Sequence, residues 1–158
     1  MYDFLLITHN IFRWIVILLA IYVLITNYQG WKKAGPFTNK NKIINTVFVG
    51  TLDLQLLIGL VLYFFYSTAT KLAFANMAEA MHDKVLRFWT VEHLLGMVIA
   101  VTLAHIGSVV SKRAKTDPEK FRKAFIYFTI VIIIILLSIP FAFRGVERPL
   151  NPFEHLSN

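Results

Sequence analysis

The chain of 158 residues contains no cysteine. Without thiols it cannot form disulfides, thiolate metal sites, iron–sulfur clusters or the thioether bonds of a c-type haem, so any haem has to be held non-covalently. Charged residues are also scarce, at 16%, whereas hydrophobic residues make up 57% of the chain, and the mean hydropathy is +0.62. One small core cannot hide that much apolar surface. The composition therefore excludes an ordinary soluble domain and indicates a membrane protein, with the lipid bilayer as its surroundings.

The apolar residues are gathered in four runs, each close to the ~20 residues that a helix needs to cross the hydrocarbon. We predict an all-α fold, an integral membrane up-and-down four-helix bundle that forms a single domain over residues 1–158. Between the second and third runs, apolar residues from Phe74 to Val85 recur at helical spacing, which predicts a short surface helix or an outward extension of the third span. The predicted spans are residues 4–27, 44–66, 86–110 and 124–143.

The formal net charge is +7, and ten of the sixteen basic residues lie in two short segments, after the first span and after the third. Basic residues in short loops are typical of the cytoplasmic side of a membrane. No basic helix face is interleaved with aromatic residues, which argues against nucleic acid as a partner. We therefore expect a multi-pass membrane protein with these two segments in the cytoplasm and both termini outside. The ten residues are Lys32, Lys33, Lys40, Lys42, Lys112, Arg113, Lys115, Lys120, Arg122 and Lys123.

The third span is the most informative stretch, because it carries Glu92, His93 and His105 within an apolar run. Ionisable side chains inside a membrane span are costly, and by default they are interpreted as functional or as paired with one another. Small residues follow His93 along the same helix face and predict a groove that either a flat cofactor or another helix can occupy. The small residues of this groove are Gly96, Ala100, Ala104 and Gly107.

Two histidines from different spans are predicted to lie at one level in the membrane. His9 is about 9 Å from the outer end of the first span and His93 about 10 Å from that of the third, at 1.5 Å per residue. Two imidazoles at one depth can take the two axial positions of a six-coordinate haem b. Without a metal, the same pair can hydrogen bond to carbonyl groups or to each other. We predict His9 and His93 as the metal ligands of one non-covalent haem b.

Several charged residues are expected near this pair. Arg13 lies one turn from His9, where it can contact a haem propionate or pair with Glu92 or Asp53. Three further cations are expected at the outer interface, where they can meet haem propionates or extend into the headgroups. These cations are Lys84, Arg87 and Arg144.

A second ionisable group is expected deeper in the bundle. His105 lies twelve residues beyond His93, roughly 18 Å deeper, and no second deep histidine is present to complete another haem site. Asp53 enters the second span from the cytoplasmic side and can come near the level of His105. The two residues can form a buried structural pair joined by a hydrogen bond, a proton relay or, together with Glu92, part of a quinone site.

Four segments together resemble a family of small four-span membrane proteins from Bacteroidetes that are often labelled cytochrome b-like. The segments are HNIFRWIVI, LQLLIGLVLYF, RFWTVEHLLGMVIAV and IPFAF, one from each predicted span. The resemblance implies the four-helix architecture, haem binding and a role for the motif residues His9, His93, Arg13 and Trp14. The chain departs from the family by having Asp53 where a histidine is expected, and His105 where none is usual.

The residues and the resemblance together favour a b-type cytochrome of the bacterial inner (cytoplasmic) membrane. It takes electrons from a quinol or a membrane dehydrogenase and passes them to an outer acceptor. Such a protein transfers electrons and is not a stand-alone enzyme. A second hypothesis is a cofactor-free accessory or assembly subunit that packs its Gly/Ala faces against a larger membrane complex. A third is a proton-coupled transporter that uses Asp53, Glu92 and His105, although no inverted repeat is visible.

Overall fold

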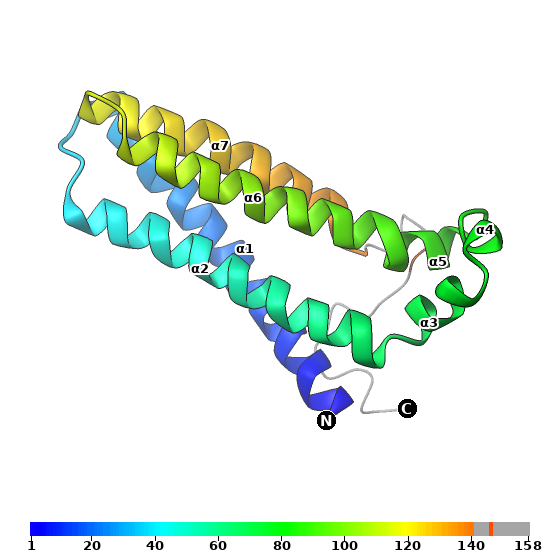
Figure 1. Cartoon of the computed structure of the whole chain (residues 1–158). Coiled ribbons are helices and arrows are strands. Elements are labelled where there is room, and N and C mark those ends of the chain that lie inside the picture. Colours follow the sequence, from blue (N-terminus) through cyan, green and yellow to red (C-terminus); the bar gives the residue numbers. More distant parts are fainter. Residues whose placement is uncertain (141–145, 147–158) are drawn as a thin grey trace.

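A computed structural model describes residues 1–140 and residue 146. Within this part of the chain the structure is all α-helical and contains no strand, as predicted (Figure 1). Each of the four long helical segments has the length and apolar character that crossing a bilayer needs, which is the pattern of a multi-pass membrane protein. The four main helices are α1 (Tyr2–Lys33), α2 (Asn39–Val61), α6 (His93–Lys112) and α7 (Asp117–Ser138).

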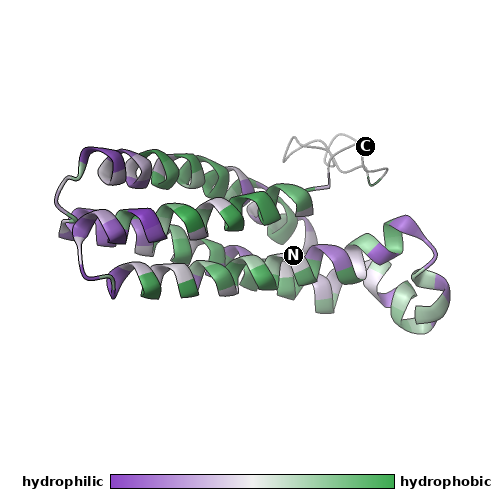
Figure 2. Ribbon diagram, turned by 90° about the horizontal axis from the view of Figure 1, so that it is seen from above, coloured by the Kyte–Doolittle hydropathy of each residue, from purple (hydrophilic) through white to green (hydrophobic). Residues whose placement is uncertain are grey.

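The four helices form a ring in which each packs against two neighbours. Helix α1 contacts α2 and α7, and α6 also contacts α2 and α7, so that α1 and α6 face each other diagonally across the bundle. Figure 1 shows the chain reversals after α1 and after α6 at the same end of the molecule. We call this the basic end, because the ten clustered lysines and arginines lie there, and we call the opposite end the histidine end. Figure 2 shows hydrophilic residues at the basic end and at the opposite end, with mainly hydrophobic residues along the helices between them.

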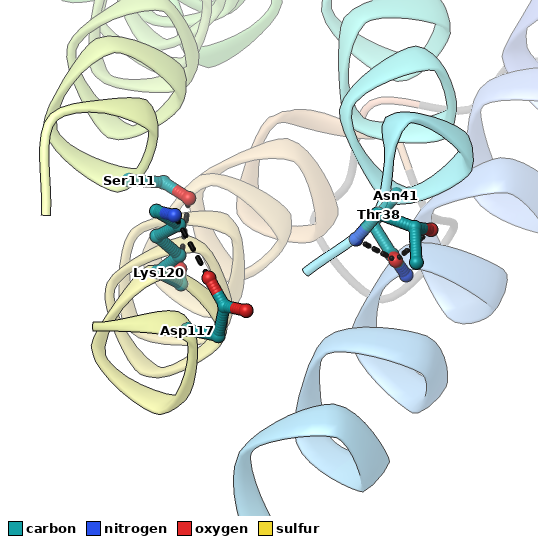
Figure 3. A network of polar contacts seen from close by, with 5 residues as sticks. All are labelled: Thr38, Asn41, Ser111, Asp117 and Lys120. Carbon is teal, nitrogen blue, oxygen red and sulfur yellow. Dashed lines mark hydrogen bonds and ion pairs between the residues drawn. The ribbon is translucent and has the colours of Figure 1, made fainter. Parts of the chain in front are cut away.

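Local hydrogen bonds define the helix starts at the basic end (Figure 3). The backbone N–H and the hydroxyl of Thr38 both donate to Asn41 Oδ1, at 3.0 and 2.7 Å, at the start of α2. At the start of α7, Lys120 Nζ pairs with Asp117 Oδ1 at 2.8 Å. The Ser111 hydroxyl donates to the Lys120 carbonyl and joins α6 to α7. The contact to the Thr38 N–H gives a partner to a backbone donor at a helix start, and the Ser111 hydrogen bond holds the start of α7 against the end of α6.

The basic half of the bundle is tightly packed. Phe48 and Phe128 are both fully buried, with ring centroids 5.2 Å apart. Asn27 and Asn45 are also buried, and their amides hydrogen bond to each other between α1 and α2. Gly107 of α6 lies directly against the Tyr127 side chain, so that a Cβ at this position would overlap α7. Aromatic rings and a reciprocal amide pair therefore fill the space between the helices in this half.

The histidine end is built from shorter and less regular elements. The α-helical repeat widens to π-helical turns at η1 (Leu62–Tyr66) and η2 (Phe88–Glu92). Between them lie α3 (Thr68–Ala75), α4 (Met77–Ala80) and α5 (Lys84–Arg87). The third span therefore continues outward to Lys84, as one of the two predicted alternatives had it.

The predicted single surface helix between the second and third spans is wrong, because two side chains interrupt the segment. Asn76 accepts a hydrogen bond from the backbone of Glu79, and Asp83 accepts one from the backbone of Leu86, so each starts a new helix. Such N-caps take a non-helical backbone conformation. Apolar residues do recur at helical spacing in this segment, but Asn76 and Asp83 divide it into separate short helices.

Helix α7 ends at Ser138, because the following Ile139 adopts an extended conformation ahead of Pro140. A residue before proline disfavours the helical conformation. The last residues of the predicted fourth span, 141–143, and Arg144 lie outside the described residues.

Candidate functional site

His9 of α1 and His93 of α6 meet across the diagonal of the bundle. Their ring centroids are 6.5 Å apart and their planes are inclined by 70°. Both residues are partly buried. The structure thus brings together the two imidazoles that the depth estimate had placed at one level, even though 84 positions of sequence separate them.

The orientation of His93 is set by the end of α7. Its Nδ1 lies 2.8 Å from the Ser138 carbonyl oxygen, one of the last carbonyls of that helix. A carbonyl oxygen only accepts, so in the neutral imidazole Nδ1 carries the proton and Nε2 carries the lone pair. Phe88 and Trp89 flank the same ring, with centroids 5.9 and 5.6 Å away. This arrangement is typical of a metal-ligating histidine, whose second nitrogen donates to a carbonyl.

His9 is positioned by helix α2. A Cβ added to Gly59 would stand 3.1 Å from His9 Cε1, so the absence of a side chain at Gly59 lets the imidazole lie against α2. Gln55, one turn earlier, donates from Nε2 to the His9 carbonyl oxygen at 3.0 Å. The side chain of Gln55 is 9% exposed, and its Oε1 has no hydrogen-bond partner among the described residues.

Three hollows adjoin the two imidazoles, and each is lined by both His9 and His93. One, of about 60 Å³, extends toward Arg13 and the end of α7, and a second, of about 40 Å³, extends toward Gly59 and Tyr63. The third, of about 70 Å³, opens toward the histidine end. Beyond it lies a hollow of about 200 Å³, which shares Leu62, Ser67 and Trp89 with the third.

The ring separation fits a metal ion held between two axial imidazoles. A metal–imidazole bond is about 2 Å, and with about 1 Å from each nitrogen to its ring centre, two such rings stand roughly 6 Å apart. The observed 6.5 Å agrees with this value. The donor set also fits, because two neutral imidazoles without a thiolate or carboxylate are what a six-coordinate haem b uses. Among the described residues there is no cluster of three or more metal-ligating side chains.

Besides the two imidazoles, four side chains line both of the first two hollows and divide the free volume: Leu52, Gln55, Met97 and Ile135. Each hollow is smaller than the roughly 300–1,000 Å³ of a ligand pocket. A macrocycle therefore needs these side chains to move aside, whereas the distance between the two imidazole centroids already agrees with axial ligation.

The charged residues around the pair are held by specific contacts. Arg87 Nε pairs with Glu92 Oε1 at 2.8 Å, and Arg87 Nη1 donates to the Met81 carbonyl at 3.0 Å. Arg87 therefore joins the α4–α5 connection to η2. Arg13 lines the first hollow, and its guanidinium carbon lies 5.6 Å from the centre of the Trp14 ring.

Gly96 lies at a helix interface. A Cβ at Gly96 would overlap the Ser138 side chain of α7, as a Cβ at Gly107 would overlap Tyr127. The sequence left open whether a flat cofactor or another helix occupies the small-residue groove. In the structure helix α7 packs there. Gly96 contributes to the site by letting α7 approach close enough for Ser138 to reach His93.

Asp53 and His105 form a pair, as one of the sequence alternatives had it. His105 Nε2 lies 2.8 Å from Asp53 Oδ1. The pair is on the outside of the bundle, with 40% of the Asp53 side chain and 56% of the His105 side chain exposed. A buried structural pair is therefore wrong, and neither residue lines the hollows around the imidazoles.

Sequence reasoning missed four contributors to the site: the Ser138 carbonyl, Gln55, Gly59 and the bond between Tyr63 and Thr90. The Tyr63 hydroxyl donates to the Thr90 carbonyl at 2.8 Å and ties η1 to η2. A π-helical turn releases backbone carbonyls from the normal ladder and is frequent at functional sites. Gln55 and Gly59 carried one usable signal, since a polar residue and a glycine one turn apart in an apolar span indicate a helix contact.

The comparisons with known proteins do not assign the chain to a family. No protein-family model matches the chain, and no curated protein and no solved structure matches it either.

Proposed function

We propose that the protein is a membrane b-type cytochrome that holds one haem b between His9 and His93 near one end of the bundle. The observation that carries this proposal is the meeting of two imidazoles, 6.5 Å apart, across the diagonal of a four-helix bundle. A haem iron with two imidazole ligands exchanges single electrons and keeps no open position for oxygen chemistry. The function is therefore electron transfer and not the catalysis of a separate reaction.

The residues of the chain have distinct roles in this proposal. The Ser138 carbonyl keeps the proton on Nδ1 of His93, so that Nε2 remains available as a ligand. Gln55 fixes the backbone at His9, and Gly59 leaves room for its ring. Arg13 brings a positive charge to the edge of the first hollow, where it can pair with an acidic group of the cofactor. The largely apolar lining limits the access of water to the site.

The wider context follows from the charge distribution and the sequence motifs. The positive-inside rule supports an orientation with the basic end in the cytoplasm and the histidine end outside. The membrane would be a bacterial inner membrane, as the resemblance to the Bacteroidetes family implies. The electron donor would be a quinol or a membrane dehydrogenase, and the acceptor would lie on the outer side. The four sequence segments support membership of the small four-span Bacteroidetes family.

Absorption spectra of the purified protein, oxidised and reduced, test this function. We expect a haem Soret band and, after reduction, the sharp bands of a six-coordinate b-type haem. His9→Ala and His93→Ala should each abolish or strongly alter these bands. His105→Ala is the matched control, because it removes an imidazole from α6 outside the hollows, and it should leave the spectrum unchanged. A protein without a Soret band, or one unaffected by the first two variants, contradicts the proposal.

The small volume of the hollows favours a second candidate, a cofactor-free accessory or assembly subunit of a larger membrane complex. In that case the imidazole pair stabilises the bundle. Affinity purification from native membranes distinguishes the two candidates. A stoichiometric complex without haem supports the accessory subunit, whereas recovery of the chain alone with haem contradicts it.

A further inference from the structure

The exposed Asp53–His105 pair differs from the rest of the bundle exterior. Asp53 of α2 and His105 of α6 are joined at 2.8 Å across the outer seam of the two helices. The corresponding outward face of α7 is aliphatic. Its exposed residues are Ile126, Ile130, Ile133, Leu136 and Leu137.

The depth of the pair makes its exposure significant. Lys112 Nζ donates to Thr46 Oγ1 at 3.2 Å on the same seam, near the basic end. His105 lies seven residues before Lys112, or about 10 Å further along the helix. When the helices cross a bilayer, the pair therefore lies within the hydrocarbon. Ionisable side chains at that depth almost always face protein or a water-filled cavity. This seam accordingly requires a polar surface that covers it.

The chemistry of the seam favours a second copy of the chain as the partner that covers the Asp53–His105 pair. An acid and a base side by side match their own image under a two-fold axis, because each Asp53 then faces the His105 of the other copy. A partner that carried charge of one sign would satisfy only one of the two residues. Two-fold symmetric contacts of this self-complementary kind are the most common in homo-oligomers.

The backbone beside the pair is open to close approach. Gly50 lies one turn from Asp53 on the exposed side of α2, and a Cβ built on it meets no atom within 4 Å. Small residues at such positions let transmembrane helices pack closely, while polar side chains hydrogen bond between them.

We propose that the α2–α6 seam, defined by Thr46, Gly50, Asp53 and His105, is the interface of a two-fold symmetric dimer of this chain. In the dimer the two Asp53–His105 pairs form one four-membered network shielded from lipid. This proposal does not depend on what the His9–His93 site holds.

Cysteine cross-linking in membranes tests the dimer, because the natural chain has no cysteine. Gly50→Cys places a thiol in open space on the seam, and oxidation with copper phenanthroline should yield a disulfide-linked dimer on a non-reducing gel. Ile130→Cys is the matched control, since Ile130 is exposed on α7 at a similar distance from the basic end. It should yield about tenfold less dimer if copies meet only at the seam.

Two further variants in the Gly50→Cys background test the role of the pair. Asp53→Leu combined with His105→Leu leaves no unpaired charge and keeps the apolar exterior, so the chain should still insert, and cross-linking should fall about tenfold. Exchanging the two residues, Asp53→His with His105→Asp, restores an acid beside a base and should restore the dimer. Equal cross-linking at both cysteine positions, no effect of the leucine variant, or linkage only to a different protein would overturn the proposal.

Discussion

The two halves of the bundle are built on different principles. In the basic half, fully buried aromatic rings and a closed pair of asparagine amides fill the space between the helices. In the half that carries the histidines, the helices widen into two π-helical turns and leave several hollows around two imidazoles. The same four helices therefore combine a tightly packed half with one that retains free space.

This difference indicates that one half of the bundle provides stability and the other half provides the site. Tight packing fixes the relative positions of the helices, because interiors at close-packed density resist displacement. Rigid helices then hold His9 of α1 and His93 of α6 opposite each other, with ring centroids 6.5 Å apart. The comparison predicts that substitutions in the basic half reduce stability, whereas substitutions at the histidine end change the properties of the site.

The largest expected effect is from Phe48→Ala. Phe48 is fully buried against Phe128, and removing a buried phenylalanine typically lowers the free energy of unfolding by about 3–5 kcal/mol. Denaturation of the purified protein in mixed detergent measures this loss. Phe64→Ala is the matched control, because Phe64 is 59% exposed on the same helical segment, and it should change the stability little. A smaller loss for Phe48→Ala than for Phe64→Ala would show that the basic half is not closed as described.

A smaller loss is expected from Gly107→Ala. The added methyl group would overlap Tyr127 of α7, and overpacking of this kind costs about 1–3 kcal/mol. Gly50→Ala is the control, since its methyl group points into open space and alanine is favoured over glycine in a helix by up to about 1 kcal/mol. Unfolding is measured at a high ratio of detergent to protein, which separates individual copies. Equal losses for the two variants would contradict the close contact of α6 with α7.

Much of the architecture could be predicted, because hydrophobic length and charge are local properties. The four apolar runs predicted four long helices, and the level of His9 and His93 followed from counting residues along two helices. The rotation of each helix about its axis did not follow, since it depends on which helices become neighbours. For that reason the groove at Gly96 had two possible occupants, and the exposed position of Asp53 and His105 was not foreseen.

The contacts that orient the two imidazoles could not be predicted from the sequence for a different reason. Ser138 acts through its backbone carbonyl, which any residue type has, and only the place where α7 ends makes that oxygen available. The Tyr63 hydroxyl of η1 likewise donates to a backbone carbonyl, that of Thr90 in η2. Side-chain identities reveal such contacts only when the tertiary arrangement is known.

A modest effect is expected from Asn27→Leu in the basic half. The variant leaves the Asn45 amide buried without its partner, which should lower the free energy of unfolding by about 1 kcal/mol. Asn27→Leu combined with Asn45→Leu removes both amides and should recover most of the loss, because no unsatisfied polar group remains. The absorption spectrum should be the same in both variants. A spectral change would mean that the two halves are not independent.

The smallest effect on stability, and the sharpest on the site, is expected from Gly59→Ala. The new Cβ would lie 3.1 Å from His9 Cε1, so the imidazole must shift by a few tenths of an ångström. The strain of such a shift, of the order of 0.5–1.5 kcal/mol, is offset by the gain of about 1 kcal/mol for alanine in a helix. The free energy of unfolding should therefore stay nearly constant. The low-spin electron paramagnetic resonance signal of the proposed bis-imidazole haem should shift, because it depends on the orientation of the ligand rings. Leu57→Ala is the control, because Leu57 lies on the exposed side of the same helix, and it should leave that signal unchanged. If Gly59→Ala also leaves the signal unchanged, His9 is not a ligand of the proposed haem.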